Sequence, residues 1–385
     1  LGADWLTAAW GQNAALYATS PAASIVETVV GNWLKAVFGL PPSAGFALVT
    51  GCQMAHVTCF AAARHHLLHE RGWNVETDGL RGAPRIRVIS SRRQHASIER
   101  AIRMLGLGTN SLTLLESDER ETLDANALQA ALEADETAPT IVVLQAGDIN
   151  TGSFDRFSTL IPLAKRYGAW LHVDGAFGLW AAASPRYARL LEGVSEADSW
   201  ATDGHKWLNV PFDCGFAFVR HADAHRAAMS VSAPYVAANA ELRDQLDWNP
   251  EWSRRARGFS TYAAIRELGR SGIASLIERT CKHASDIVER LGELPAVEVL
   301  WRPIINQGLV RFLDQRPNAI DSDHDRRTEA VIHAIVESGE AFFAATTWRG
   351  KRCMRISVLN WRTSSEDVRR TTNAVSRVLE EMQAE

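Results

Sequence analysis

The sequence is poor in cysteine and has no long apolar run. Its 385 residues include five cysteines (Cys52, Cys59, Cys214, Cys281 and Cys353), an odd number without a CxxC pair. This pattern favours reduced thiols in a cytosolic protein over a disulfide framework. No uninterrupted apolar stretch approaches the roughly 18 residues that cross a bilayer, and the start lacks a basic, signal-like segment. We therefore expect a soluble, cytoplasmic protein.

A surplus of positive charge is also missing. Lys and Arg total 41 against 45 Asp and Glu, which gives a net charge of -4. Nothing in this balance suggests a nucleic-acid or anionic-membrane partner. The apolar fraction of 46% and the charged fraction of 22% are ordinary for globular chains, so disorder, collagen and coiled coil are excluded as descriptions of the whole chain. At roughly 150 residues per domain, the length suggests two or three domains.

From about residue 46 onward, short β-branched runs alternate with longer stretches of helical periodicity. This alternation is typical of βα units that build a mainly parallel sheet, so the fold class is α/β. We expect strands at Ile86–Ser90, Leu112–Leu115, Thr140–Gln145, Ala169–Asp174, Asp198–Thr202 and Gly215–Arg220. The helices expected between them are Gln53–Glu70, His95–Leu105, Asn126–Ala134 and Phe157–Tyr167.

After about residue 222 the alternation lapses, and a second mixed unit follows. We expect three parts: an N-terminal helical remainder at 1–45, a large domain at 46–263 and a smaller α+β domain at 264–385. Because the chain begins with Leu1 rather than Met, the natural protein is expected to begin earlier, with an upstream arm. After the lapse we expect two helices, at Tyr262–Arg270 and Ile273–Leu291. The second mixed unit that follows is expected to contain strands at Val297–Trp301, Gly308–Phe312, Ala341–Thr347 and Met354–Val358, and helices at Arg327–Ser338 and Ser365–Met382.

The most informative segment contains HVDGAFG and, after the next expected strand, DGHKWLN. Asp174 ends an apolar strand, and ligands of open parallel sheets bind at that edge. Lys206 lies between His205 and Trp207, where partial burial destabilises an ammonium and makes the amine a nucleophile. An acid facing a pyridine nitrogen and a lysine that forms a Schiff base are the two groups that pyridoxal phosphate requires. Taken singly, each also fits an ordinary role: a turn residue for Asp174 and a surface lysine for Lys206.

A cofactor of this kind also needs a grip on its phosphate. Gly51, Cys52 and Gln53 follow the apolar run FALV and open a long helix, where the free N–H groups of a helix N-terminus attract an anion. His95 follows another strand at the start of the next helix, where its imidazole can stack on a planar ring. An ordinary strand-to-helix turn and a helix-capping histidine explain the same residues without a ligand.

These stretches together resemble the pyridoxal-phosphate-dependent group II decarboxylases, which include aromatic-amino-acid, histidine, glutamate and diaminobutyrate decarboxylases. The resemblance begins near YATSPAASIVETVVGNWL, includes both motifs above, and continues to MRISVLNWRTSSEDV near the C-terminus. It implies fold type I, with a mainly parallel sheet in the large domain, and a homodimer with shared active sites. It also implies pyridoxal 5'-phosphate as the cofactor and an L-amino acid as the substrate, without a metal.

The resemblance further implies roles for individual residues. Lys206 corresponds to the Schiff-base lysine, Asp174 to the partner of the pyridine nitrogen, and His95 to the histidine stacked on the ring. The other residues of the implied cofactor site are Ala176 beside the ring, Gly51, Cys52 and Gln53 at the phosphate, and Ser199 and His205 nearby.

Two further residues have roles implied only by the resemblance. Tyr235, in the segment Pro234-Tyr235-Val236, corresponds to the tyrosine of a mobile loop that is thought to protonate the substrate Cα after carbon dioxide leaves. Phenylalanine at that position is associated in the family with aldehyde formation, so Tyr235 favours simple decarboxylation; an ordinary loop aromatic is the alternative. Ser253 corresponds to a residue that reaches the cofactor phosphate of the neighbouring subunit.

Several positions depart from the family pattern. Gln53 and Met54 stand where relatives commonly carry a small hydroxyl residue and an acid, and Ile149 stands where many carry a hydroxyl. Asp203 occupies a position that is often neutral. Because a carboxylate repels a phosphate dianion, Asp203 is expected to face a cation or water. Arg355 is a candidate equivalent of the substrate-carboxylate arginine in related transaminases.

The sequence thus predicts decarboxylation of an L-amino acid to the amine and carbon dioxide. The motifs SPAA, QHASIERA, PYV and HKWLN resemble the aromatic branch and favour an aromatic substrate, whereas glutamate, 2,4-diaminobutyrate and histidine stay open. The alternatives within the fold are a carbon–carbon lyase, an aminotransferase and an aldehyde-forming enzyme. A non-catalytic scaffold that binds the cofactor is the alternative outside enzymes.

Overall fold

The computed structural model describes residues 1–231 and 243–384 and divides into two compact units. Unit 1 consists of Leu1–Gly147 and Phe154–Ala274, and unit 2 consists of Asp148–Ser153 and Ser275–Glu385.

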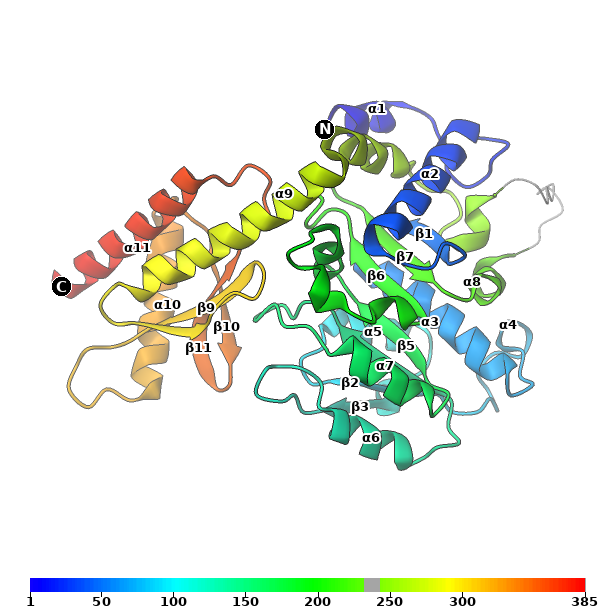
Figure 1. The fold of residues 1–385 in the computed structure, drawn as a ribbon, viewed down its shortest axis with the longest axis horizontal. Coiled ribbons are helices and arrows are strands. Elements are labelled where there is room, and N and C mark those ends of the chain that lie inside the picture. Colours follow the sequence, from blue (N-terminus) through cyan, green and yellow to red (C-terminus); the bar gives the residue numbers. More distant parts are fainter. Residues whose placement is uncertain (232–242, 385) are drawn as a thin grey trace. The chain divides into compact units, whose positions relative to one another are not determined.

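Unit 1 is built on a seven-stranded sheet with the strand order β1-β7-β6-β5-β4-β2-β3 (Figure 1). The strands β2 to β6 run parallel to one another, and β7 is antiparallel to both β6 and β1. The mainly parallel sheet and its expected strands are confirmed, and β1, which the sequence marks only as an apolar run, adds an edge. The bounds are β1 (Gly45–Val49), β2 (Arg87–Ser91), β3 (Leu112–Leu115), β4 (Thr140–Gln145), β5 (Trp170–Asp174), β6 (Ser199–Asp203) and β7 (Gly215–Val219).

Helices cover both faces of this sheet, with α3 and α5 on one face and α7 on the other (Figure 1). Such cover is what a parallel sheet with buried strands requires. The helices of unit 1 that precede α9 are α1 (Gly2–Ala9), α2 (Pro21–Phe38), α3 (Cys52–His69), α4 (Val75–Asp78), α5 (Ala96–Met104), α6 (Ala125–Glu133), α7 (Phe157–Lys165) and α8 (Ala222–Met229).

Small residues let α3 lie close against the sheet. Ala55, Cys59 and Ala62 of α3 are fully buried in one apolar cluster with strand residues such as Ala201 of β6. Gly215, the first residue of β7, has no space for a side chain, because a Cβ there would lie 2.5 Å from the backbone carbon of Gly51. The close packing therefore brings the N-terminus of α3 directly against β7.

Unit 2 is a smaller α+β structure with a four-stranded antiparallel sheet in the order β10-β11-β9-β8. The expected helix at Arg327–Ser338 begins earlier, at Asp321, and the two helices expected at 262–270 and 273–291 form one element, α9 (Gly258–Gly292), which Gly269 interrupts with φ 59° and ψ -177°. The other bounds are β8 (Val297–Trp301), β9 (Gln307–Phe312), α10 (Asp321–Glu337), β10 (Ala344–Trp348), β11 (Lys351–Ser357) and α11 (Ser365–Ala384).

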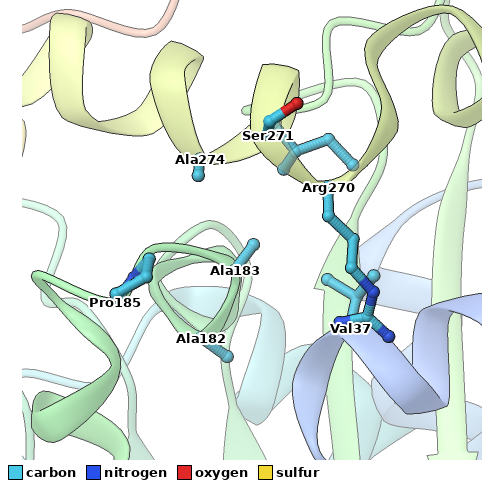
Figure 2. A pocket seen from close by; sticks show the side chains of 8 residues that line it. Val37, Ala182, Ala183, Pro185, Arg270, Ser271 and Ala274 are labelled. Atoms are coloured by element: carbon cyan, nitrogen blue, oxygen red, sulfur yellow. The ribbon is translucent and has the colours of Figure 1, made fainter.

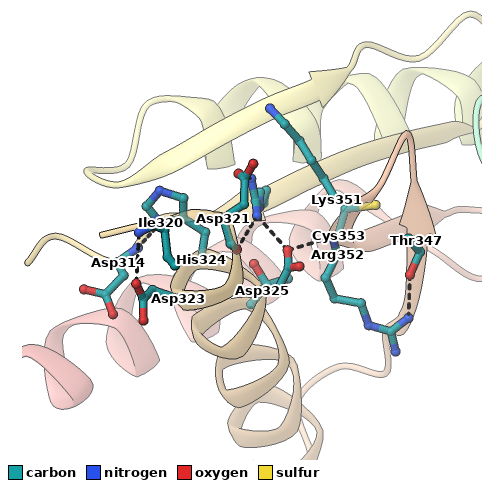
Figure 3. A network of polar contacts seen from close by, with 12 residues as sticks. Asp314, Ile320, Asp321, Asp323, His324, Asp325, Thr347, Lys351, Arg352 and Cys353 are labelled. Atoms are coloured by element: carbon teal, nitrogen blue, oxygen red, sulfur yellow. Dashed lines mark hydrogen bonds and ion pairs between the residues drawn. The ribbon is translucent and has the colours of Figure 1, made fainter. Parts of the chain in front are cut away.

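A buried arginine ties α10 to this sheet. Arg311 of β9 donates to Asp321 Oδ1 at 2.8 Å and to Asp325 Oδ1 at 2.6 Å. Asp325 also accepts the backbone N–H of Arg352 on β11 at 2.9 Å (Figure 3). Because an unpaired buried guanidinium is costly, these acids favour one placement of α10 on the sheet.

Two absences noted in the sequence have structural counterparts. All five cysteines are free and buried. Across residues 1–231 and 243–384, none of the helices combines the length and the apolar character needed to cross a membrane.

Candidate active site

The carboxyl ends of neighbouring strands bring Asp174 and Asp203 to one edge of the sheet. Asp174 ends β5 and pairs in register with Ala201 of β6, two residues before Asp203. The backbone N–H of Asp203 donates to the carbonyl of Ala176 at 3.0 Å. The loop that follows β5 is thereby held against the end of β6, at the edge where ligands of open α/β sheets bind.

Asp174 is buried, and its carboxylate is fixed from three sides. Oδ1 accepts the backbone N–H of Ala176 at 3.1 Å and lies 3.9 Å from the Cys52 sulfur. Oδ2 lies 3.7 Å from His56 Nε2. A buried carboxylate with this few donors is poised to meet a positively charged or protonated group.

Lys206 follows β6 and forms an ion pair with Asp203. Its Nζ lies 3.0 Å from Asp203 Oδ2. Burial lowers the pKa of the Lys206 ammonium, but the charge and hydrogen bond of Asp203, together with Cys52 and Asp174, outweigh burial and leave the pKa raised. The expectation that Asp203 faces a cation is confirmed, and that cation is Lys206.

The N-terminus of α3 lies beside this ion pair. Asp203 Oδ1 accepts the backbone N–H of Cys52, the first residue of α3, at 2.6 Å. The amide of Gln53 donates from Nε2 to the carbonyl of Ser97 at 3.2 Å, which ties α3 to α5. Gly51 stands directly before the helix, and a Cβ at Gly51 would lie 3.2 Å from the ring of His205. The first turn of α3 thus faces the same space as Lys206.

His205 is oriented by the loop that follows it. Its ring stacks on Phe212 with centroids 4.1 Å apart, and Nδ1 accepts the backbone N–H of Cys214 at 3.2 Å. Nε2 lies 3.6 Å from Asp203 Oδ1. Burial lowers the pKa of His205, so the ring is neutral at pH 7.

His95 is the N-cap residue of α5. Its Nδ1 accepts the backbone N–H of Ser97 at 3.2 Å and lies 2.8 Å from the Ser97 hydroxyl. The capping role is therefore realised. The side chain is nevertheless exposed, so the ring keeps a face that a ligand can reach.

Two residues named from the sequence, Ser199 and Ser253, have other partners in the structure. Ser199 is the first residue of β6, and its hydroxyl lies 2.9 Å from both Trp170 Nε1 and His172 Nδ1. It is thus placed away from the carboxyl end of β6, and its partners are protein groups. Ser253 is exposed and accepts a hydrogen bond from Asn13 Nδ2 at 3.3 Å. Tyr235 lies outside the described residues.

Arg355 belongs to β11 of unit 2. Its Nη1 donates to the carbonyl of Ile149 at 3.3 Å. Ile149 lies in the short segment Asp148–Ser153, which belongs to unit 2. Burial lowers the pKa of Arg355, and the charge of Asp148 opposes this shift.

His56 is a residue of this site that the sequence reasoning missed. It lies one helical turn after Cys52 on α3, and the ligand atoms of Cys52, His56 and Asp174 all lie within 4.8 Å of one another. The sequence contained a signal for His56, because residues i and i+4 of a helix share a face. Cys52 stands at the phosphate-binding turn implied by the resemblance, so His56 could have been expected on the same face.

A separate cavity of about 360 Å³ opens elsewhere in unit 1 (Figure 2). It contains none of the residues gathered at the sheet edge, and its lining is mostly apolar. The lining residues are Val37, Ala182, Ala183, Pro185, Arg270, Ser271, Ile273 and Ala274.

Comparison with known proteins identifies the class. Residues 1–313 match the family described as the pyridoxal-dependent decarboxylase conserved domain. This match covers most of the chain, and the chain belongs to that family. Pyridoxal 5'-phosphate is accordingly the cofactor, and amino acid decarboxylation is the reaction class. The fold type, the cofactor and the enzyme class expected from the sequence are confirmed.

Individual relatives are distant. The chain is 24% identical to the aromatic-L-amino-acid decarboxylase of Bacillus atrophaeus, covering 99% of this chain and 78% of the relative. It is 27% identical to the histidine decarboxylase of Rattus norvegicus, covering 93% of this chain but only 55% of the relative. The structure of Oryza sativa TDC with PLP and tryptamine matches with a TM-score of 0.92 at 22% identity, covering 99% of this chain and 81% of that one.

The residues at the sheet edge fit the cofactor in their chemistry. A buried carboxylate, an amine and a helix N-terminus lie at one edge, and they suit a pyridine nitrogen, an aldehyde and a phosphate respectively. The one mismatch is Asp203, whose carboxylate takes the first N–H of α3 and has the same sign of charge as a phosphate.

Proposed function

We propose that this chain decarboxylates an aromatic L-amino acid, with Lys206 as the residue that attaches the cofactor. The observation that carries this proposal is the arrangement of Lys206, Asp174 and the N-terminus of α3 at a single sheet edge. These elements come from distant parts of the chain, and each supplies a different group that pyridoxal phosphate needs.

The bound cofactor supplies an electron sink for the bond that breaks at Cα. Asp174 holds a proton on the ring nitrogen, because an anion at that point favours the protonated form. Lys206 supplies the amine that fixes the cofactor, and the first turn of α3 receives the phosphate with the side chain of Gln53 and the ring of His205 nearby. The exposed ring of His95 would stack on the cofactor, and Tyr235 would return a proton to Cα.

An aromatic substrate is favoured by the names of several relatives. They include an aromatic-L-amino-acid decarboxylase, the tyrosine decarboxylase 2 of Arabidopsis thaliana and the rice TDC crystallised with tryptamine. A histidine decarboxylase, mouse CSAD and a diaminobutyrate decarboxylase domain from Vibrio parahaemolyticus are similarly distant. Glutamate, 2,4-diaminobutyrate and histidine are therefore the competing substrates.

The first experiment replaces the attaching amine. Lys206→Ala is expected to abolish the visible absorbance of the reconstituted protein and the release of carbon dioxide, whereas Lys165→Ala, an exposed lysine paired with Glu196, is expected to leave both unchanged. An unaltered spectrum in Lys206→Ala overturns the proposal.

A second experiment identifies the substrate and the reaction. The protein is incubated with aromatic amino acids, histidine, glutamate and 2,4-diaminobutyrate, and amines are identified by mass spectrometry. Carbon dioxide, peroxide and keto acid are measured separately. Carbon dioxide with the amine of an aromatic substrate supports the proposal, peroxide indicates an aldehyde-forming enzyme, and keto acid indicates an aminotransferase. A holoenzyme that turns over nothing supports a scaffold.

We also propose a cytoplasmic homodimer with shared active sites, in which Ser253 reaches the neighbouring subunit's cofactor phosphate. The large apolar side chains that unit 1 exposes support an interface: Trp5 is 70% exposed and Phe212, which stacks on His205, is 78% exposed. Light scattering should give twice the chain mass. A monomer with full activity would contradict shared sites.

A further inference from the structure

A chain of buried polar groups leads from Asp174 into the interior of unit 1. His56 Nε2 lies 3.7 Å from Asp174 Oδ2, and His56 Nδ1 lies 2.9 Å from His172 Nε2. Both imidazoles are completely buried. His172 stands on β5, two residues before Asp174, so both side chains lie on the same face of the strand.

This series of polar contacts continues to the indole N–H of Trp170, a group that can only donate. His172 Nδ1 lies 2.9 Å from the Ser199 hydroxyl, and Trp170 Nε1 donates to that hydroxyl at 2.9 Å. An indole N–H can only donate, and an ionised carboxylate can only accept. The carboxylate end of this series therefore requires a donor, whereas the Ser199 hydroxyl, which accepts from Trp170, keeps its own proton to donate to His172.

The carboxylate of Asp174 selects one set of tautomers. Burial lowers the pKa of both histidines, and a neutral imidazole carries one donor and one acceptor. With Ser199 donating to His172 Nδ1, His172 donates from Nε2 to His56 Nδ1, and the proton of His56 lies on Nε2. That N–H faces Asp174 and the Cys52 sulfur, which lies 3.4 Å from Nε2. The reverse set would aim a lone pair of His56 at the carboxylate.

We propose that His56 is a positioning residue for Asp174, held by His172, Ser199 and Trp170 as the neutral Nε2–H tautomer. In that form it stabilises the ionised carboxylate without adding a net charge beside the cofactor nitrogen. Asp174 thus keeps the charge with which it holds a proton on that nitrogen. The inference rests on the proposed function, in which Asp174 meets the pyridine ring.

The first test does not depend on turnover. In the ¹⁵N-histidine-labelled holoenzyme, side-chain NMR should show His56 and His172 in the Nε2–H form without titration between pH 5.5 and 8.5, beside the signal of His225, whose Nε2 faces the Trp248 carbonyl. The loss of one signal set in His56→Gln assigns His56. A Nδ1–H tautomer for His56, or titration with a pKa near the usual value of about 6.5, overturns the proposal.

The second test separates positioning from packing. His56→Gln keeps an N–H at the reach of Nε2, whereas His56→Leu keeps apolar volume but loses the donor. In His56→Leu we expect kcat to fall about tenfold or more, with KM little changed. In His56→Gln we expect kcat to stay within about threefold of wild type. The pH profile of the visible band should shift only in His56→Leu. A tenfold loss corresponds to about 1.4 kcal/mol in the barrier.

The matched control is His225→Leu, because His225 is another fully buried histidine, hydrogen-bonded to the carbonyl of Trp248 rather than to a site residue. Equal losses in His56→Leu and His56→Gln, or a wild-type spectrum and kcat in a folded His56→Leu, overturn the positioning role. If His56→Leu fails to fold, the tautomer and the Gln variant still decide. Loss of the cofactor band from the wild-type protein would instead contradict the proposed function.

Discussion

The carboxylate of Asp203 is shared between a cation and a helix N-terminus: Oδ2 lies 3.0 Å from Lys206 Nζ, and Oδ1 accepts the first N–H of α3. The carboxylate of Asp203 thus stabilises the protonated form of the Lys206 amine, which we assign to cofactor attachment. It also accepts the Cys52 N–H, which would otherwise be free to donate to an anion. Both effects oppose cofactor loading at neutral pH, because a protonated amine is not a nucleophile and a carboxylate repels a phosphate.

Asp203→Asn is therefore expected to bind pyridoxal phosphate about tenfold more tightly, equivalent to roughly 1.4 kcal/mol. Asn keeps an oxygen for the Cys52 N–H but loses the charge that raises the pKa of Lys206. The pH above which the cofactor attaches should consequently move down. Fluorescence quenching at several pH values measures both quantities.

The control for that variant is Asp286→Asn, which removes the acid of an exposed ion pair with Lys282 in unit 2. It should leave cofactor affinity unchanged. Weaker cofactor binding in Asp203→Asn than in wild type would show that the carboxylate assists loading.

Gly215→Ala tests the close contact between β7 and α3. A Cβ would lie 2.5 Å from the Gly51 backbone and 3.0 Å from the Cys52 nitrogen, so the N-terminus of α3 must shift. We expect unfolding stability to fall by about 1–3 kcal/mol and cofactor affinity to fall with it, measured by thermal unfolding and cofactor titration. Gly11→Ala, where a Cβ meets nothing within 4 Å, should change neither.

Removal of metal ions should not affect the enzyme. Although Cys52, His56 and Asp174 come together, burial and the charge of Asp203 raise the pKa of the Cys52 thiol well above its usual value, and a neutral thiol is a poor ligand. We expect dialysis against a chelator to leave absorbance and activity intact, with elemental analysis finding no stoichiometric metal. About one equivalent of zinc, lost together with activity, would overturn this prediction.

Acid should destabilise the folded protein through its buried histidines. Burial, with the charge of Arg243, lowers the pKa of His225 to about 3, whereas an unfolded histidine titrates near 6.5. As the pH falls from about 6.5 towards 3, this histidine binds a proton in the unfolded chain but stays neutral in the folded protein. The free energy of unfolding therefore falls by up to about 1.4 kcal/mol per pH unit per histidine.

His225→Gln removes that titration and should make the pH dependence of unfolding shallower by up to one proton. Calorimetric unfolding of wild type and variant at pH 7, 6 and 5 measures the difference, and the contributions of other groups cancel. Identical slopes would mean that His225 takes up its proton at the same pH in the folded and unfolded protein, which would contradict its lowered pKa.

The strand ends were readable from the sequence, whereas the partners of individual side chains were not. Asp174 could be placed at a ligand-binding edge because it ends an apolar run, and the carboxyl ends of parallel strands share one edge whatever their order. Lys206 follows the next such strand, so its proximity needed no knowledge of register.

Ser199 shows the limit of that reasoning. The resemblance placed Ser199 near the cofactor, but Ser199 stands at the other end of β6 and pairs in register with His172 of β5. Its hydrogen bonds depend on which strand lies beside β6. The cation facing Asp203 was expected as a type, but its identity as Lys206 required the geometry of the turn after β6.

The antiparallel strand β7 determines when this site can form. Among the described strands, β1 hydrogen-bonds to β7 alone, and β7 joins it to β6. During synthesis, the segment that leads into α3 emerges early but has no place in the sheet until residues 215–219 have left the ribosome. The candidate active site at the sheet edge is therefore assembled from contacts between sequence-distant parts of the chain, and closing such long loops is slow. A nascent chain stalled before Gly215 would contain the turn before α3 and Lys206, but it would lack β7, the strand that brings the two together.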